Sequence, residues 1–129
     1  DQELSAEDDD RLLNEMIFSS AVICGPSTVA LDAVFVDKPV IIVQFHPDTR
    51  GYYDGIAYRY DYNHFRFGID CGAFRVARSR EELLSLIELY RNEPSRDAEG
   101  RAALRRAYCG PSDGMSGARV AQAVTKVMA

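Results

Sequence analysis

The fold of this chain is decided by the stretch Ala21-Val-Ile-Cys-Gly-Pro-Ser-Thr-Val-Ala-Leu-Asp-Ala-Val-Phe-Val-Asp-Lys-Pro-Val-Ile-Ile-Val-Gln-Phe45. Residues 21–24 and 40–45 are predicted to be buried strands, because short, nearly continuous apolar runs are typical of parallel sheets covered on both faces. Residues 27–36 between them are predicted to be a helix, with Ser27 as its cap and Pro26 tolerated near its start. This order of strand, helix and strand predicts an α/β fold with a parallel sheet flanked by helices.

The turn between the first strand and the helix carries the clearest indication of chemistry. Gly25, Ser27 and Thr28 bring two hydroxyls and free backbone N–H groups to the first turn of the helix, where the positive end of the helix dipole lies. Asp32 follows one turn later on the same face as Thr28, within reach of a ribose hydroxyl. A phosphate site followed by an acidic sugar-binding residue indicates a nucleotide. The competing interpretation is that Ser27 and Thr28 only cap the helix and that Asp32 is a solvated side chain.

Apolar spacing elsewhere predicts further helices and one more strand. An acidic lead or linker, residues 1–10, precedes a helix over residues 11–18, and a long aromatic loop is expected over residues 46–72. The other predicted elements are a strand over 73–77, a helix capped by Ser79 and ending at residue 91, and helices over 97–108 and 116–128; apolar faces are expected at Leu83, Leu84, Ile87 and Tyr90 and at Val120, Ala123, Val124 and Val127. Residues 11–129 are therefore predicted to be part of a three-layer Rossmann-like domain, its later half.

Composition limits the classes of function. The 129 residues carry a net charge of −5, from 20 acidic and 15 basic side chains, which argues against general binding to nucleic acid but not against one nucleotide. Three cysteines without close pairing favour a reducing cytoplasm over a disulfide framework. Apolar stretches are too short for a membrane span, and no leader segment is recognised. The two histidines lack the neighbours of a metal site, so neither a metal nor a cofactor is expected.

Several co-linear motifs extend from the turn towards the end of the chain. They are Gly25-Pro-Ser-Thr-Val-Ala-Leu-Asp-Ala33 with Asp37-Lys-Pro-Val-Ile41, then Tyr62-Asn-His-Phe65, Phe74-Arg-Val-Ala-Arg-Ser-Arg-Glu-Glu-Leu83 and Cys109-Gly-Pro-Ser-Asp-Gly-Met-Ser-Gly-Ala-Arg-Val120. With these motifs the chain resembles the C-terminal domain of glycosyltransferases that have two facing Rossmann-like domains, the GT-B fold. It is most similar to the branch containing CDP-glycerol glycerophosphotransferases and related bacterial surface-polysaccharide transferases.

The resemblance implies a role for each residue of the turn. Gly25, Ser27 and Thr28 would hold the donor diphosphate, and Asp32 would take the place of the acidic residue that binds the ribose. Related UDP-N-acetylglucosamine 2-epimerases carry a Glu at this position, one methylene longer than Asp32. The implied partner is a nucleotide-activated sugar or a CDP-glycerol-type donor. The N-terminal acceptor domain, with the usual catalytic base, and the first strands of the donor domain are missing from these residues. No turnover is therefore expected from this chain alone.

Further candidates lie in the aromatic segment. His46 follows a strand at its carboxyl end, where open α/β sheets bind ligands, and His64 belongs to a motif shared with the family. Both are candidates for catalysis, and the competing interpretation is structural hydrogen bonding. Arg50 and Arg66 are possible phosphate ligands, because a guanidinium pairs bidentately with phosphate. The tyrosines of this segment are expected to cover the sheet edge or a neighbouring domain, rather than to stack on a base.

Two classes of function stay open. In the first, the chain is the donor-binding part of a cytoplasmic transferase for cell-surface polysaccharide, with peripheral membrane association of the full protein as a further expectation. In the second, it is a non-catalytic nucleotide- or partner-binding module, since a fold does not determine a function. A nucleotide-sugar 2-epimerase-like enzyme is a third alternative. The presence of a second Rossmann-like domain before residue 1 would separate the first two.

Overall fold

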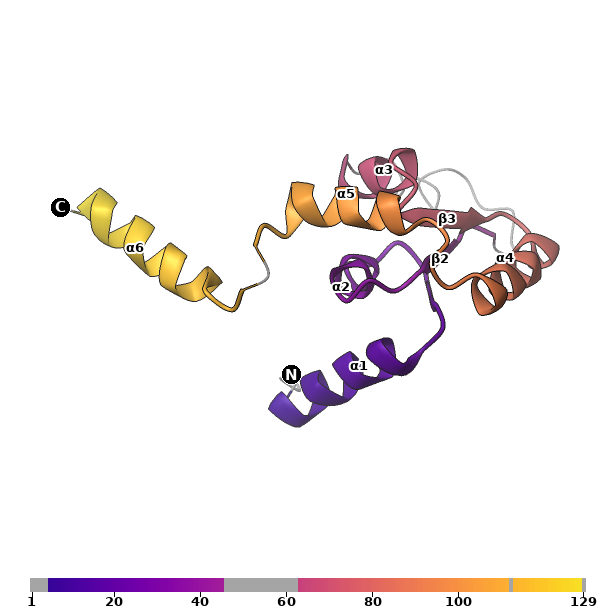
Figure 1. Ribbon diagram of the computed structural model, residues 1–129, viewed down its shortest axis with the longest axis horizontal. Helices are drawn as coiled ribbons and strands as arrows, with labels where there is room; N and C mark the ends of the chain where they lie inside the picture. Colours follow the sequence, from indigo (N-terminus) through magenta and orange to yellow (C-terminus); the bar gives the residue numbers. More distant parts are fainter. Residues whose placement is uncertain (1–4, 46–62, 112, 129) are drawn as a thin grey trace.

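The computed structural model describes residues 5–45, 63–111 and 113–128, and it is an α/β arrangement (Figure 1). Its elements in chain order are α1 (Ala6–Phe18), β1 (Val22–Cys24), α2 (Val29–Phe35), β2 (Val40–Val43), α3 (Asn63–Asp70), β3 (Phe74–Ala77), α4 (Arg80–Asn92), α5 (Ala98–Tyr108) and α6 (Ser116–Met128). The three strands pair in parallel in the order β1-β2-β3. The predicted fold class is therefore confirmed.

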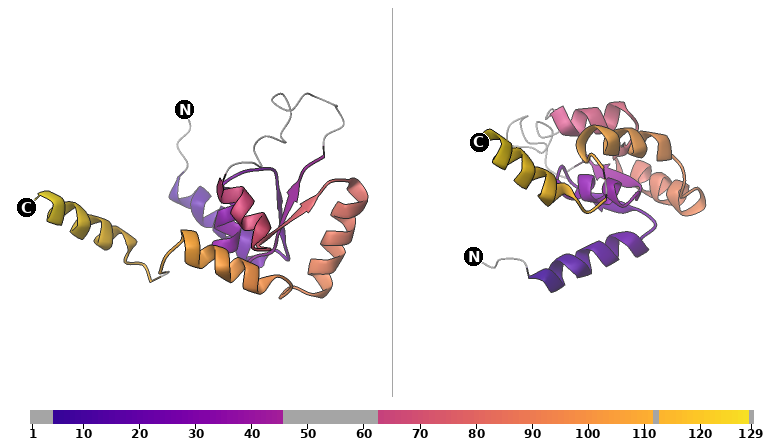
Figure 2. Two further views of the ribbon diagram at one scale, coloured as in Figure 1. Left: turned by 90° about the horizontal axis from the view of Figure 1, so that it is seen from above. Right: turned by 60° about the vertical axis from the view of Figure 1, so that its left-hand side comes forward.

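Helices cover both faces of the sheet. Val40 and Ile42 of β2 belong to a core shared with α2, α3 and α5. Ile41 lies between them and points to the opposite face, where it packs with Tyr90 of α4. Figure 2 shows α4 on one side of the sheet and α3 and α5 on the other. Because β2 is buried on both faces, its sequence is wholly apolar.

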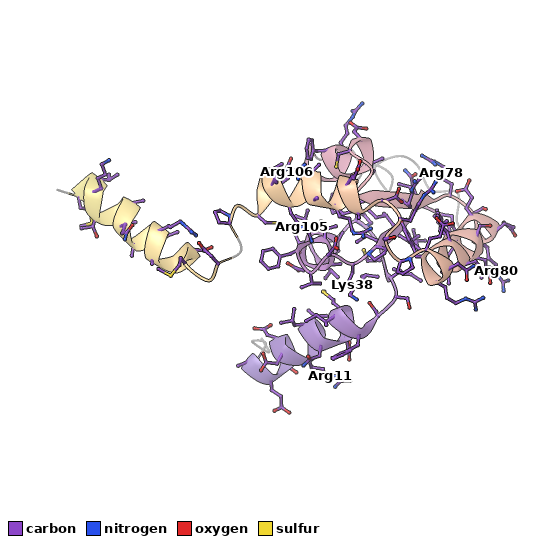
Figure 3. The ribbon with its side chains drawn as sticks, in the orientation of Figure 1. Arg11, Lys38, Arg78, Arg80, Arg105 and Arg106 are labelled. Atoms are coloured by element: carbon purple, nitrogen blue, oxygen red, sulfur yellow. The ribbon has the colours of Figure 1, made fainter. Side chains whose placement is uncertain are left out.

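A buried arginine fastens α5 to the end of α2. Arg101 is 1% exposed; its Nε donates to Asp37 Oδ1 at 3.0 Å, and its Nη1 donates to the carbonyl oxygen of Arg96 at 2.6 Å. Arg105, which lies between α5 and α2 (Figure 3), is 3.3 Å from the same carboxylate and 3.5 Å from the carbonyl oxygen of Val34. Asp37 has a φ of 60°, the left-handed conformation that commonly follows a helix end. These bonds hold the turn between α2 and β2.

A second charged cluster joins β3 to the start of α5. Arg75 donates to both carboxylate oxygens of Asp97, at 2.6 and 2.8 Å, and the Tyr90 hydroxyl donates to Oδ2 at 2.9 Å. The Arg75 guanidinium lowers the pKa of Asp97, while burial and the bond to Asp97 raise the pKa of Tyr90. The carboxylate therefore stays charged and the phenol protonated. Asp97 precedes α5 as predicted, but its side chain serves this cluster and does not cap the helix.

The predicted start of the first helix is wrong. The first helix begins at Ala6 and not at residue 11, because Ser5 and Asp8 form a capping box. Glu7, Asp8 and Asp9 of the predicted lead thus occupy the first turn of α1, where they complement the helix dipole.

The predicted loop over residues 46–72 contains a helix, α3. Phe65 of α3 is 3% exposed, and its ring centroid lies 6.2 Å from that of Phe74 on β3. Gly68 lets the helix approach this ring closely, since a Cβ there would lie 2.3 Å from it. Burial of these aromatic rings stabilises a short helix that local composition does not indicate.

The predicted helix after Ser79 is confirmed as α4. The Ser79 hydroxyl accepts from the N–H of Glu82 at 3.1 Å, as a capping serine does. The Glu82 carboxylate accepts from the N–H of Arg78 at 2.6 Å and not from that of Ser79, so the return hydrogen bond of a capping box is displaced by one residue. Leu84 was predicted on the apolar face but is 55% exposed.

Both terminal helices keep apolar side chains in solvent. On α1, Met16 is buried, whereas Leu12, Leu13 and Ile17 are exposed. The predicted stripe of α6 forms on the helix, but its valines are exposed, and α6 extends away from the sheet (Figures 1 and 2). Among the helices of the described residues, none has the length and apolarity needed to cross a membrane.

Candidate functional site at the carboxyl edge of the sheet

The carboxyl ends of the three strands lie at one edge of the sheet. Cys24 ends β1, Val43 ends β2 and Ala77 ends β3, and all three strands run in parallel. The pairing continues one residue further, since the N–H of Gln44 donates to the carbonyl oxygen of Ala77 at 2.8 Å. In open α/β sheets, ligands bind outside this edge. The candidate site is therefore built from the turns that follow the strands.

The turn after β1 is open to solvent and has unused hydrogen-bonding groups. A Cβ added at Gly25 would have no atom within 4 Å, and Ser27 and Thr28 are exposed. Within the described part of the chain, the N–H groups of Ser27 and Thr28 donate to no backbone acceptor. The Ser27 hydroxyl accepts from the N–H of Val29 at 3.4 Å, a long hydrogen bond. The turn therefore presents donors to whatever approaches it.

The predicted start of the helix needs one correction. Thr28 is the residue before α2 and does not lie inside the helix, although its φ of −59° and ψ of −21° are already helical. Its side chain makes no capping hydrogen bond, and the bond expected of a cap comes from Ser27. A ligand can therefore bind the hydroxyl of Thr28 without breaking a capping hydrogen bond of α2.

Asp32 lies one turn after Thr28, as predicted, since its N–H donates to the Thr28 carbonyl oxygen at 3.2 Å. Its side chain is exposed and lines a groove of about 300 Å³ between α1 and α2, where Asp9 is a second carboxylate. Asp9 could not be predicted as a neighbour of Asp32 from the sequence, because α1 meets α2 only in the tertiary structure.

Cys24 ends β1 directly before the turn, but its chemistry is passive. Burial raises the pKa of its thiol to about 11. The thiolate is the nucleophilic form of cysteine, so a thiol with this pKa is inert at neutral pH. Cys24 is therefore a packing residue.

The candidates of the aromatic segment are only partly placed. His46 and Arg50 lie outside the described residues, as do the tyrosines between residues 52 and 62. His64 is in the first turn of α3, with its side chain outside the described set. Because α3 leads into the amino end of β3, its first turn lies towards the carboxyl edge (Figure 2). Arg66 is exposed on the same helix.

Arg78 is a cation at this edge that the sequence analysis did not single out. It follows β3 directly, is exposed, and lies beside the end of that strand (Figure 3). Its guanidinium forms no ion pair with any residue that the structure describes. Its position immediately after a predicted parallel strand is the sequence signal that could have found it. In the described ranges, no group of three or more His, Cys, Asp or Glu side chains could hold a metal ion.

The layers and the open turn define a class of protein: parallel α/β domains with a Rossmann-like sheet and a polar turn at its carboxyl edge. A family model described as CDP-glycerol:poly(glycerophosphate) glycerophosphotransferase matches residues 4–126. The chain therefore belongs to this family of transferases, and the branch indicated by the sequence motifs is confirmed. Neither curated proteins nor solved structures include a significant match to it.

Proposed function

We propose that this chain is the donor-binding part of a GT-B-type transferase that moves glycerol phosphate, or a related sugar or polyol phosphate, from a nucleotide-activated donor. The supporting observation is the open turn of Gly25, Ser27 and Thr28, with unused N–H and hydroxyl donors at the carboxyl edge of a parallel sheet. Membership of the CDP-glycerol:poly(glycerophosphate) glycerophosphotransferase family supports a nucleotide donor. We place the reaction in the cytoplasm, in the synthesis of bacterial cell-surface polysaccharide.

The turn would act on the leaving group. In the proposed reaction, glycerol phosphate moves from a CDP-glycerol-type donor to an acceptor hydroxyl. The bond that breaks joins the transferred phosphorus to the oxygen that bridges the two phosphorus atoms of the donor. Negative charge then grows on the departing nucleoside monophosphate. N–H and hydroxyl donors fixed around that phosphate stabilise the developing charge. Asp32 would accept hydrogen bonds from the ribose, while Arg78, Arg66 and Arg50 are the cations available for the second phosphate.

The acceptor and the catalytic base would come from a part of the protein outside these residues. In the described structure, β1 pairs only with β2, and Ile23 of β1 is 47% exposed. A strand with an unpaired edge and an exposed apolar side chain favours further pairing. We propose that additional strands of the donor domain cover this edge and that a preceding domain binds the acceptor, with His64 and His46 as candidates for contact with the substrate.

Nucleotide binding by this chain tests the proposal. Titration with CDP-glycerol or CDP should shift the amide NMR signals of Ser27, Thr28 and Asp32, with a dissociation constant of about 1 mM for an incomplete site. Thr28→Ala should abolish binding and leave the melting temperature unchanged, because its hydroxyl makes no capping bond. Thr125→Ala, which also removes an exposed helix hydroxyl, is the matched control. Wild-type binding by Thr28→Ala would refute the phosphate role of the turn.

Two further variants separate the phosphate from the ribose. Gly25→Ala should fold normally, since the added Cβ meets no atom within 4 Å. It should weaken the binding of every nucleotide that approaches the backbone at this position. Asp32→Asn should weaken the binding of ribonucleotides more than that of deoxyribonucleotides, because a carboxylate is a stronger hydrogen-bond acceptor for the 2′-hydroxyl than an amide is. Equal losses for both nucleotides would exclude a ribose contact.

A further inference from the structure

The groove between α1 and α2 begins at the residue that is proposed to hold the ribose. The two helices lie side by side (Figure 1), and the groove measures about 300 Å³. Asp32 lines it and stands one turn after Thr28, whose carbonyl oxygen accepts from the Asp32 N–H at 3.2 Å. The other lining side chains are the carboxylate of Asp9 and the apolar groups of Leu12, Leu13, Met16, Phe35 and Val36. The groove therefore continues the proposed donor site beyond Asp32.

The carboxylate of Asp9 is available to a ligand. Within the part of the chain that the structure describes, its oxygens accept no hydrogen bond and form no ion pair. The next carboxylate, Asp8, is already engaged, since Oδ2 accepts from the N–H and the hydroxyl of Ser5 at 3.0 and 2.7 Å. Because α1 leads into the amino end of β1, its first turn lies towards the carboxyl edge of the sheet (Figure 2). Asp9 therefore lies towards the same edge as the open turn.

The charge of the groove determines which part of the donor it can hold. Two carboxylates repel a diphosphate, so the phosphates are favoured at the open turn, with its free N–H groups. A nucleobase is neutral and flat, and it can cover Leu12, Leu13 and Phe35, which are 40%, 44% and 45% exposed. The base is bonded to the ribose, so it must lie next to the residue that holds the ribose.

We propose that this groove receives the base of the donor and that Asp9 selects cytosine by accepting a hydrogen bond from its 4-amino group. The inference rests on the proposed function and adds a residue that determines specificity. Carboxylates accept from the same amino group when proteins recognise cytosine in DNA. Uracil carries a carbonyl oxygen at this position, which places one acceptor against another and leaves both unpaired. The family description names a CDP-linked donor, and Asp9 supplies a physical reason for that choice of base.

Titration of the 129-residue chain with CDP and UDP, followed by NMR, tests the selection. Wild type should bind CDP at least about 10-fold more tightly than UDP, because only cytosine satisfies the charged acceptor. The diphosphate of the pyrimidin-2-one riboside has hydrogen in place of the 4-amino group. It should bind with intermediate affinity, since it lacks the donor of cytosine and the repelling oxygen of uracil.

Asp9→Asn distinguishes recognition of the base from a structural role. The new amide can donate to the uracil oxygen, so the variant should bind CDP more weakly and UDP more tightly than wild type does, with a ratio of affinities near one. Asp10→Asn is the matched control, because it removes the same charge from the adjacent exposed residue, which does not line the groove. It should keep the preference of wild type. Circular dichroism should show wild-type folding for both variants.

Phe35→Ala tests the apolar wall separately. Loss of a ring that stacks on the base should weaken CDP and UDP by a similar factor, about 10-fold, and leave the preference for CDP in place. Unchanged affinities in this variant would place the base outside the groove.

Two results would overturn the inference and leave the proposed function standing. They are equal affinities of wild type for CDP and UDP, and a preference for CDP that survives Asp9→Asn. Binding of neither nucleotide by wild type would refute the proposed function, and the selection of the base with it.

Discussion

Replacing the two members of the Arg101–Asp37 pair should destabilise the protein by unequal amounts. Arg101 is 1% exposed, whereas the side chain of Asp37 is 50% exposed. Asp37→Asn keeps an oxygen acceptor and tolerates the left-handed backbone, but it leaves a buried guanidinium without a counter-charge. Loss of one partner of a buried ion pair costs about 3 kcal/mol or more.

Arg101→Met should cost less than Asp37→Asn. It removes the buried charge itself and fills most of the same space, while the carboxylate of Asp37 keeps Arg105 at 3.3 Å and its contact with water. The remaining loss is the hydrogen bond to the carbonyl oxygen of Arg96, about 1 kcal/mol. At roughly 4 °C per kcal/mol for a domain of this size, Asp37→Asn should lower the melting temperature by about 12 °C and Arg101→Met by about 4 °C.

The double variant provides the decisive comparison. Without Arg101, the charge of Asp37 has no buried partner to neutralise. The double variant of Asp37→Asn and Arg101→Met should therefore have nearly the same free energy of unfolding as Arg101→Met alone, about 1 kcal/mol below that of wild type. Urea unfolding of the four proteins measures the cycle directly. Additive losses, near 4 kcal/mol for the double variant, would refute the buried-charge reasoning, as would a larger loss for Arg101→Met than for Asp37→Asn.

Three further predictions concern stability alone. Gly100→Ala should cost more than 1 kcal/mol in urea unfolding, because its Cβ would lie 2.5 Å from a backbone oxygen, whereas the exposed helical glycine in Gly117→Ala meets nothing and should leave the protein as stable or more stable. The folded state raises the pKa of Cys24 from 9.0 to about 11, so the free energy of unfolding should fall as the pH rises through this range, by on the order of 1 kcal/mol for a thiol that keeps some solvent contact. Cys24→Ala should reduce this loss of stability at alkaline pH. An unchanged dependence of stability on pH would show that another group causes the loss. Arg75 lowers the pKa of Asp97, so the charged carboxylate stabilises the fold at pH values above the ordinary pKa of 3.8, and this stabilisation is lost as the pH falls through the lowered pKa. Asp97→Asn should therefore be less stable than wild type at pH 7 by calorimetry, and this difference in stability should shrink in acid.

The elements whose patterns are local could be predicted from the sequence. The wholly apolar β2 and the Ser79 cap of α4 each depend on a few neighbouring residues, and the structure confirms both. Helix α3 was missed because it is held by contact between Phe65 and Phe74, which lie on different elements. Its sequence is amphipathic but only eight residues long, so it was not separated from the aromatic segment before it.

The candidate site follows the same division. The turn of Gly25, Ser27 and Thr28 is readable from the sequence, because a strand, a small-residue turn and a helix are adjacent along the chain. Arg78 directly follows a predicted parallel strand, so its place at this edge could have been predicted, but only the structure shows that its side chain is exposed there and forms no ion pair with a described residue.

By itself, the sequence determined the α/β class, the parallel strands, the position of the polar turn and the family, because these depend on apolar runs and on motifs of adjacent residues. Only the tertiary structure decided which charges are buried and which helix faces remain open. Arg101 looks like any surface arginine of a helix until α5 packs on the turn of Asp37. The valines of α6 look like a core stripe until the helix is seen to leave the sheet. Burial and charge pairing are properties of contacts between distant segments, and such contacts exist only in the folded chain.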